Sequence, residues 1–145
     1  MVSTEGFTHS ATPDTTVSGL LVALARHLDT HRELPELTSA TVVRYATPSR
    51  VQAQLDSDTR LPKVAAGLLS WAGTLAEAAA FAWRTDYSTH LEVTGRLPEG
   101  AEVLVYTGVD TGVLPDLAVG ARVPLPWATL HAWAALPASS RGGAA

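Results

Sequence analysis

The alanine-rich stretch from Asp58 to Arg84 is the longest continuous pattern in the chain, and it constrains the fold more than any other segment. Its apolar residues recur in steps of three and four, which places them on one side of a helix with 3.6 residues per turn. They are Val64, Leu68, Trp71, Leu75, Ala78 and Ala82. Asp56-Ser57-Asp58 supplies a cap, and Pro62 lies in the first turn, where a missing N–H is tolerated. The pattern predicts one long helix with an apolar stripe that other elements must cover.

Four segments on either side of this stretch are typical of β-strands. Ser39 to Ala46 is rich in β-branched residues, and Val51 to Leu55 alternates strictly between apolar and polar side chains. The turn signal Thr47-Pro48-Ser49 joins them into a predicted antiparallel hairpin. After the long helix, Thr89 to Leu97 and Ala101 to Val109 form a second predicted pair around Pro98-Glu99-Gly100.

Two further helices are expected, one near each end of the chain. The first runs roughly from Thr15 to Asp29 with Asp14 as its N-cap. The second covers residues 126–136 and begins at Pro126. Residues 1–13 are polar and aperiodic and residues 137–145 are small and polar, so both are expected to be flexible tails.

These elements predict a single α+β domain over residues 14–136, within the usual size of one domain. The order α-β-β-α-β-β favours a two-layer sandwich, in which two helices cover one face of a four-stranded antiparallel sheet. The short C-terminal helix is additional. The pattern leaves the strand order open.

Strand alternation divides the expected sheet into two faces. The helix-facing side takes seven apolar residues: Val51, Ala53, Leu55, Leu91, Val93, Val103 and Val105. The other side takes Val42, Arg44, Gln52, Gln54, His90, Glu92, Thr94, Glu102, Leu104 and Tyr106. This second face is mostly polar with a small apolar island. Water, the C-terminal helix or a second subunit are the three covers that we consider.

Bulk properties exclude several classes of function. The chain has 145 residues, no cysteine and a net charge of -4, and its ten basic residues are scattered. Nucleic-acid binding usually needs clustered Lys and Arg, so the charge pattern argues against it. No segment approaches the ~20 apolar residues of a membrane span, and no signal peptide is evident. We expect a soluble cytoplasmic protein without a membrane partner.

No catalytic, cofactor or metal site is predicted. His27 and His31 have the spacing of two zinc ligands on one helix face, but Leu28 stands where the zincin pattern needs Glu. We interpret the pair as a solvated helix end. Asp56, Asp58 and Asp86 flank the long helix and are interpreted as capping residues. Nucleophile elbows and Gly-rich phosphate loops are also missing from the sequence.

Three short segments are distinctive: Leu24-Ala25-Arg26-His27-Leu28, the following Glu33-Leu34-Pro35, and Val93-Thr94-Gly95-Arg96-Leu97-Pro98. In these segments the chain resembles a group of small, uncharacterised actinobacterial proteins, and the resemblance covers about residues 15–135. A single lysine and no isoleucine or asparagine fit a high-GC genome. The resemblance implies a place beside plasmid and integrative-element genes, an accessory role in a mobile element and no known activity.

The leading hypothesis is a noncatalytic accessory domain that binds an unknown protein or a second copy of itself. Its candidate interaction surface consists of Val42, Leu104, Tyr106, Trp127, Leu130 and Trp133. The alternative is a small-molecule-binding module with a pocket between helices and sheet, lined by Trp71, Trp83 or Phe81. A weaker third hypothesis is an enzyme that uses His90, Glu92 and Tyr106.

Overall fold

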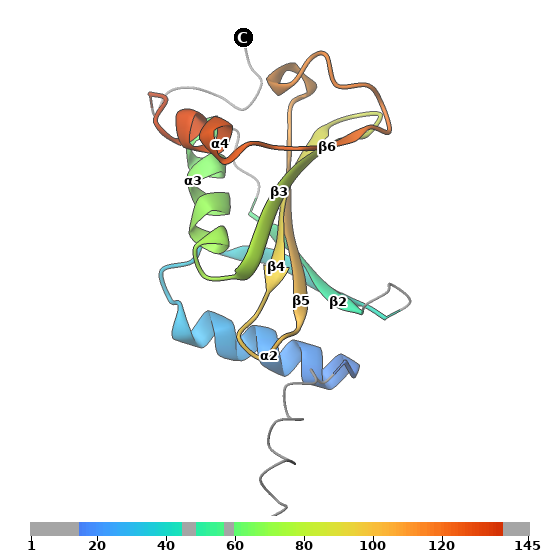
Figure 1. Ribbon diagram of the computed structural model, residues 1–145, viewed down its shortest axis with the longest axis vertical. Helices are drawn as coiled ribbons and strands as arrows, with labels where there is room; N and C mark the ends of the chain where they lie inside the picture. Colours follow the sequence, from blue (N-terminus) through green and yellow to red (C-terminus); the bar gives the residue numbers. More distant parts are fainter. Residues whose placement is uncertain (1–14, 45–48, 57–59, 138–145) are drawn as a thin grey trace, which may run out of the picture.

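The computed structural model describes residues 15–44, 49–56 and 60–137 (Figure 1). Several predictions lie outside these residues. They are the two tails apart from Pro137, the Asp14 cap, the Thr47-Pro48 part of the first turn and the Ser57-Asp58 part of the second cap. Among the described residues, Thr16 is the N-cap of the first helix, and its hydroxyl accepts a hydrogen bond from the Gly19 N–H at 3.0 Å.

The chain folds into an α+β domain, which confirms the predicted class. The helices are α2 (Val17–Thr30), α3 (Leu61–Ala72) and α4 (Trp127–Ala134), with a 3-10 turn η2 (Thr111–Val113). The strands are β1 (Leu37–Val43), β2 (Arg50–Leu55), β3 (Ala76–Arg84), β4 (Thr89–Arg96), β5 (Glu102–Val109) and β6 (Arg122–Pro124).

Within the described residues, the strands form one six-stranded sheet in the order β1-β2-β5-β4-β3-β6. The two predicted hairpins, β1–β2 and β4–β5, are present and antiparallel. They are joined side by side through β2 and β5, which run parallel, so the sheet is mixed. The predicted four-stranded antiparallel sheet is therefore wrong in strand number and direction.

The predicted long helix is wrong in its second half. The helix ends at Ala72, and the Thr74 and Leu75 N–H groups bond to the carbonyls of Trp71 and Ala72, which closes the last turn. Ala76–Arg84 is strand β3, held between β4 and β6. Alanine is the strongest helix former and is depleted in strands, so the alanine run favoured a helix that strand pairing overrides here.

The start of α3 also differs from the prediction. Arg60 is its N-cap residue, and the Arg60 side chain makes no capping hydrogen bond. Pro62 does lie in the first turn, where its ring is tolerated because the first N–H groups have no partner within the helix.

The core lies between the sheet and the helices. Val64, Leu68 and Trp71 form the buried face of α3, and they pack with the seven apolar sheet residues predicted to face the helices. Helices α3 and α4 stand beside each other on one side of the sheet, and α2 lies across its lower end in Figure 1. Leu130 of α4 is fully buried, so the C-terminal helix packs on its own chain.

Candidate functional site

The face of the sheet opposite the helices carries a hollow of about 610 Å³. Pockets for small molecules commonly have volumes of about 300–1,000 Å³. Its lining residues are Arg50, Gln52, Trp83, His90, Glu92, Leu104, Tyr106 and Arg122. We call this the outer hollow; it lies over strands β2 to β6 of the sheet.

Strand register explains why these side chains meet. Residues directly opposite each other on paired strands point to the same face. Trp83 lies opposite both His90 and Arg122, and Glu92 lies opposite Tyr106. The neighbouring helix-side positions, such as Leu91 and Ala82, are fully buried in the core. The alternation that fills the core therefore directs the charged and aromatic side chains into the outer hollow.

Three rings form a continuous aromatic row along the outer hollow. The His90 ring stacks on Tyr106 with centroids 5.3 Å apart and an interplanar angle of 25°. The Trp83 ring meets His90 edge-on at 5.3 Å and 88°. Trp83 is 38% exposed, which is high for so large an apolar side chain. The row offers a ligand both a flat apolar surface and polar ring edges.

A charged pair closes one end of the outer hollow. The Glu92 side chain is only 7% exposed, and its Oε1 accepts a hydrogen bond from Arg122 Nε at 3.1 Å. The Arg122 guanidinium also lies 3.7 Å above the centre of the Phe81 ring, a cation–π contact. A buried carboxylate is costly unless it is paired, so Arg122 on the short strand β6 neutralises Glu92.

Arg50 lies at the other end of the outer hollow, and its charge is not neutralised within the described residues. Its Nε atom is buried there without a hydrogen-bond partner, and its guanidinium makes no ion pair with any described residue. Glu102 is its register partner on β5, but the Glu102 carboxylate pairs with Arg96 at 3.6 Å. Arg50 is therefore a positive charge in the outer hollow that has no carboxylate within ion-pair distance among the described residues.

The predicted interaction surface does not form one patch. Leu104 and Tyr106 line the outer hollow, as expected from their strand. Val42 lies opposite Val51 and packs against the helix-side core, so its placement on the outer face is wrong. Val43, opposite Arg50, lies on the outer face instead. Adjacent residues of a strand point to opposite faces, so an error of one residue exchanges the two faces.

The tryptophan-bearing helix also lies elsewhere. Leu130 and Trp133 of α4 pack against the core beside α3, and Trp127 is 37% exposed. The C-terminal helix therefore does not cover the outer face, which removes one of the three covers considered from the sequence. Trp71 is fully buried in the core and does not line the outer hollow.

Sequence reasoning missed two residues of the outer hollow, Arg50 and Arg122, and it placed a third, Trp83, in a pocket on the wrong face of the sheet. Trp83 and Phe81 alternate with Ala80 and Ala82, a strand period that was visible within the alanine-rich segment. Arg50 precedes the first alternating residue of β2 and gave no signal. Arg122 belongs to a three-residue strand, which is too short for periodicity to detect.

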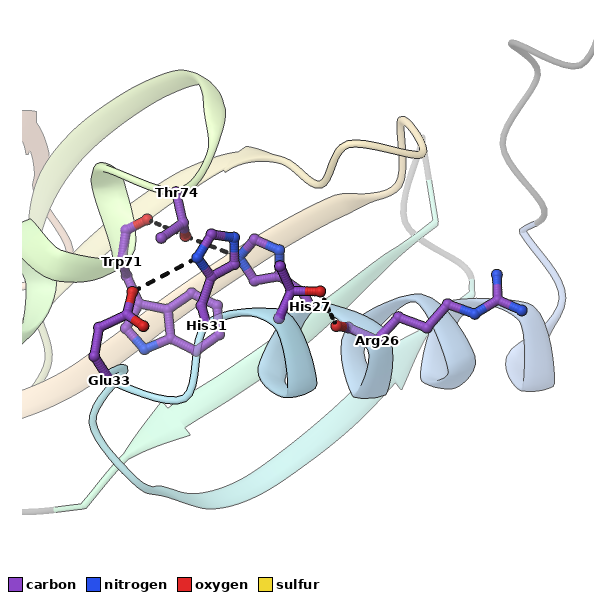
Figure 2. Close-up of polar contacts among 7 residues, drawn as sticks. Arg26, His27, His31, Glu33, Trp71 and Thr74 are labelled. Atoms are coloured by element: carbon purple, nitrogen blue, oxygen red, sulfur yellow. Dashed lines mark hydrogen bonds and ion pairs between the residues drawn. The ribbon is translucent and has the colours of Figure 1, made fainter.

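The histidine pair on α2 is not a solvated helix end. His27 is 3% exposed, and it links α2 to the end of α3 (Figure 2). The Thr74 hydroxyl donates to the Trp71 carbonyl at 2.8 Å, so it accepts from His27 Nε2–H at 2.8 Å. His27 Nδ1 is then the unprotonated nitrogen, and it is buried without a hydrogen bond in the described part of the chain.

The surroundings of His27 favour its neutral form. Burial lowers the pKa of His27 below the usual 6.5, and the neighbouring His31 ring, 4.5 Å away, lowers it further. His31 itself lies 3.6 Å from Glu33. The described residues contain no group of three or more His, Cys, Asp or Glu side chains placed to hold a metal ion. The described helices include none that is long and apolar enough to span a membrane.

Comparisons with known proteins add no assignment. No protein-family model matches the chain, and neither curated proteins nor solved structures give a significant match. The resemblance to small actinobacterial proteins therefore stays a prediction. We infer a function from the geometry of the outer hollow.

Proposed function

We propose that this chain is a noncatalytic binding module that holds a small molecule in the outer hollow. The observation that carries the proposal is the hollow of about 610 Å³ lined by the aromatic row, on the sheet face that no described helix covers. A concave, partly apolar site with a few polar groups is the usual form of a ligand pocket. The proposal keeps the sequence-based alternative of a small-molecule site but moves it to the opposite face of the sheet.

Binding is favoured over catalysis by the contacts of the three polar residues in the outer hollow. A general base is normally held by a hydrogen bond to an orienting group. The Glu92 carboxylate is instead bonded to Arg122, and the His90 ring is stacked on Tyr106. No hydrogen bond joins His90 to Glu92 or Tyr106 in the described structure. The enzyme hypothesis therefore lacks a general base that is held by an orienting residue.

The proposal predicts a fluorescence response that depends on Trp83. A panel of aromatic acids, aromatic amines and nucleosides would be titrated into the full chain, with tryptophan emission and thermal denaturation recorded. We expect a member of the panel to change the emission and raise the melting temperature. The emission change should disappear in Trp83→Phe, because a bound ligand contacts this side chain directly.

Trp127→Phe is the matched control. Trp127 is 37% exposed and Trp83 is 38% exposed, but Trp127 lies on α4, away from the outer hollow. The Trp127→Phe chain should keep the ligand response. A response lost equally in both variants, or no response from the whole panel, would contradict the proposed function.

A second candidate is the accessory interaction domain expected from the sequence, with β1 as the contact. Strand β1 lies at one edge of the sheet, and its residues 38–41 are exposed. An exposed sheet edge has unpaired backbone N–H and C=O groups, which a strand from another chain can pair with. Molar mass from size-exclusion chromatography with light scattering tests it, since an edge-paired second copy makes a dimer.

An association with mobile elements rests on the resemblance alone.

A further inference from the structure

We propose that the ligand of the outer hollow is an elongated organic anion. Its acidic group binds Arg50, and its flat apolar body lies against Leu104 and the aromatic row. This inference rests on the proposed binding function and names the chemical class of the ligand. Three observations carry it: the unpaired charge of Arg50, the internal pairing of the other charges, and the distance between the two ends of the hollow.

The first observation is the unpaired charge at Arg50. Buried or half-buried charges in proteins are normally paired, because removing them from water is costly. Arg50 is half-buried, and its Nε is fully shielded and without a partner among the described residues. Its guanidinium fork matches the geometry of a carboxylate or phosphate oxygen pair. The missing partner is therefore best supplied by an anionic group of the ligand.

The second observation is that the remaining charges of the hollow already neutralise each other. Arg122 and Glu92 form the 3.1 Å pair, so their charges cancel. The Arg and Glu side chains of the lining give two positive groups and one negative group, a net charge of +1 that is due to Arg50. The whole chain has a net charge of -4, so this local excess is opposite in sign to the average surface. An anion is selected at the Arg50 end, not at the Arg122 end.

The third observation is the span of the hollow. Arg50 lies opposite Glu102 on β5, and Tyr106, the first ring of the aromatic row, is four residues further along that strand. A strand rises about 3.3 Å per residue and neighbouring strands are about 4.8 Å apart, so the backbone positions of Arg50 and Tyr106 are roughly 14 Å apart. A single ring cannot reach from the Arg50 charge to the aromatic row. Leu104 and Gln52 lie between the two ends and offer an apolar contact and an amide.

The test compares three probes that share one rigid apolar body and differ in charge. They are biphenyl-4-carboxylate, the uncharged biphenyl-4-carboxamide and the cationic biphenyl-4-ylmethylammonium. Titration calorimetry with the full chain at low salt gives each dissociation constant. We expect the carboxylate to bind at least tenfold more tightly than the carboxamide, and the cation to bind most weakly. This order follows from one unpaired guanidinium in the site.

Variants then assign the preference to Arg50. Arg50→Met should bring the carboxylate affinity down to that of the carboxamide and leave the carboxamide affinity unchanged. Arg50→Lys should give an intermediate preference, since it keeps the charge but loses the planar fork. Arg32→Met is the control for net charge, because Arg32 is 80% exposed and lies outside the outer hollow. It should keep the wild-type preference.

Circular dichroism and thermal denaturation establish that the variants fold. Arg50→Met removes a shielded polar atom without a described partner, so we expect its melting temperature to equal or exceed that of the wild type. Equal affinities for carboxylate and carboxamide, both lost in Trp83→Ala, would overturn the anion inference and leave the proposed binding function intact. Binding of none of the three probes at millimolar concentration would overturn the inference. If the panel of aromatic acids, aromatic amines and nucleosides also gives no response, the proposed binding function is contradicted as well.

Discussion

At the scale of single residues, His27 ties the stability of the fold to pH. Its Nε2–H donates to Thr74, and its Nδ1 is shielded, so protonation would place an unpaired N–H in the core. Burial and His31 lower the pKa of His27 in the folded chain below the 6.5 of the unfolded chain. Between these two values the unfolded chain binds more protons, so the free energy of unfolding rises with pH.

The stabilisation from neutral His27 is thus fully present above about pH 6.5 and is lost as the pH falls toward the lower, folded-state pKa. We predict that urea denaturation from pH 7.5 to 5 gives a free energy of unfolding that declines with acidity. The part due to His27 has a slope of at most about 1.4 kcal/mol per pH unit, the limit for one proton. His27→Gln should have a shallower slope than the wild type.

His131→Gln is the control, since His131 is exposed on α4. It should keep the wild-type slope. An equal slope in the wild type and His27→Gln would show that another group causes the acid sensitivity.

At the scale of secondary-structure elements, Gly95 sets how closely the end of α3 approaches the sheet. A Cβ atom at Gly95 would lie 2.8 Å from the Leu75 Cβ and 3.0 Å from the Ala76 carbonyl oxygen. Leu75 is the last residue of the tight connection between α3 and β3, and Ala76 is the first residue of β3, so neither can easily move away. Gly95→Ala should therefore destabilise the fold by about 1–3 kcal/mol, the usual cost of overpacking. The free energy of unfolding in urea measures it.

Gly108→Ala is the matched control on the neighbouring strand β5. A Cβ there would meet its nearest atom, the Ser88 hydroxyl oxygen, at 3.7 Å, which is ordinary contact. This change should cost less than about 0.5 kcal/mol, and the lower entropy of the unfolded chain partly offsets any cost. Equal losses of stability in the two variants would mean that the close approach at Gly95 is not the cause.

The helices and strands also show which elements can be predicted from sequence patterns and which cannot. The strict alternation of Val51 to Leu55 and of Thr89 to Leu97 predicted strands, hairpins and the core-facing residues correctly, because burial on one side enforces a period of two. The alanine-rich segment was assigned wrongly after Ala72. Its helical preference was overridden by pairing with β4 and β6, which lie later in the chain and are not part of the segment's own pattern.

The candidate site was predictable only in part. His90, Glu92 and Tyr106 were placed together on the outer face because they belong to the well-patterned strands. Arg50, Trp83 and Arg122 join them through the parallel β2–β5 pair and the edge strand β6, which depend on long-range contacts. Those three residues carry most of the argument about the ligand.

At the scale of the whole molecule, the two edges of the sheet differ in their capacity to pair with another chain. Strand β6 has three residues and offers little backbone. Strand β1 has seven, and Leu37–Val43 contains no charged residue and no proline. Proteins usually protect sheet edges with lysine, proline or bulges. The single irregularity in β1, between Leu37 and Ser39, leaves the rest of this edge regular.

This regular edge predicts dimerisation through paired β1 strands, if the second candidate function is correct. We expect light scattering at tens of micromolar protein to give twice the mass of one chain. Ser39→Lys with Thr41→Lys should restore the monomer, because the four lysines of a pair would lie along facing edges and repel. Ala66→Lys with Ser70→Lys adds the same charge to the exposed face of α3 and should leave the dimer intact. A wild-type monomer would remove the edge-paired dimer, and the outer hollow would then be the surface on which to search for function.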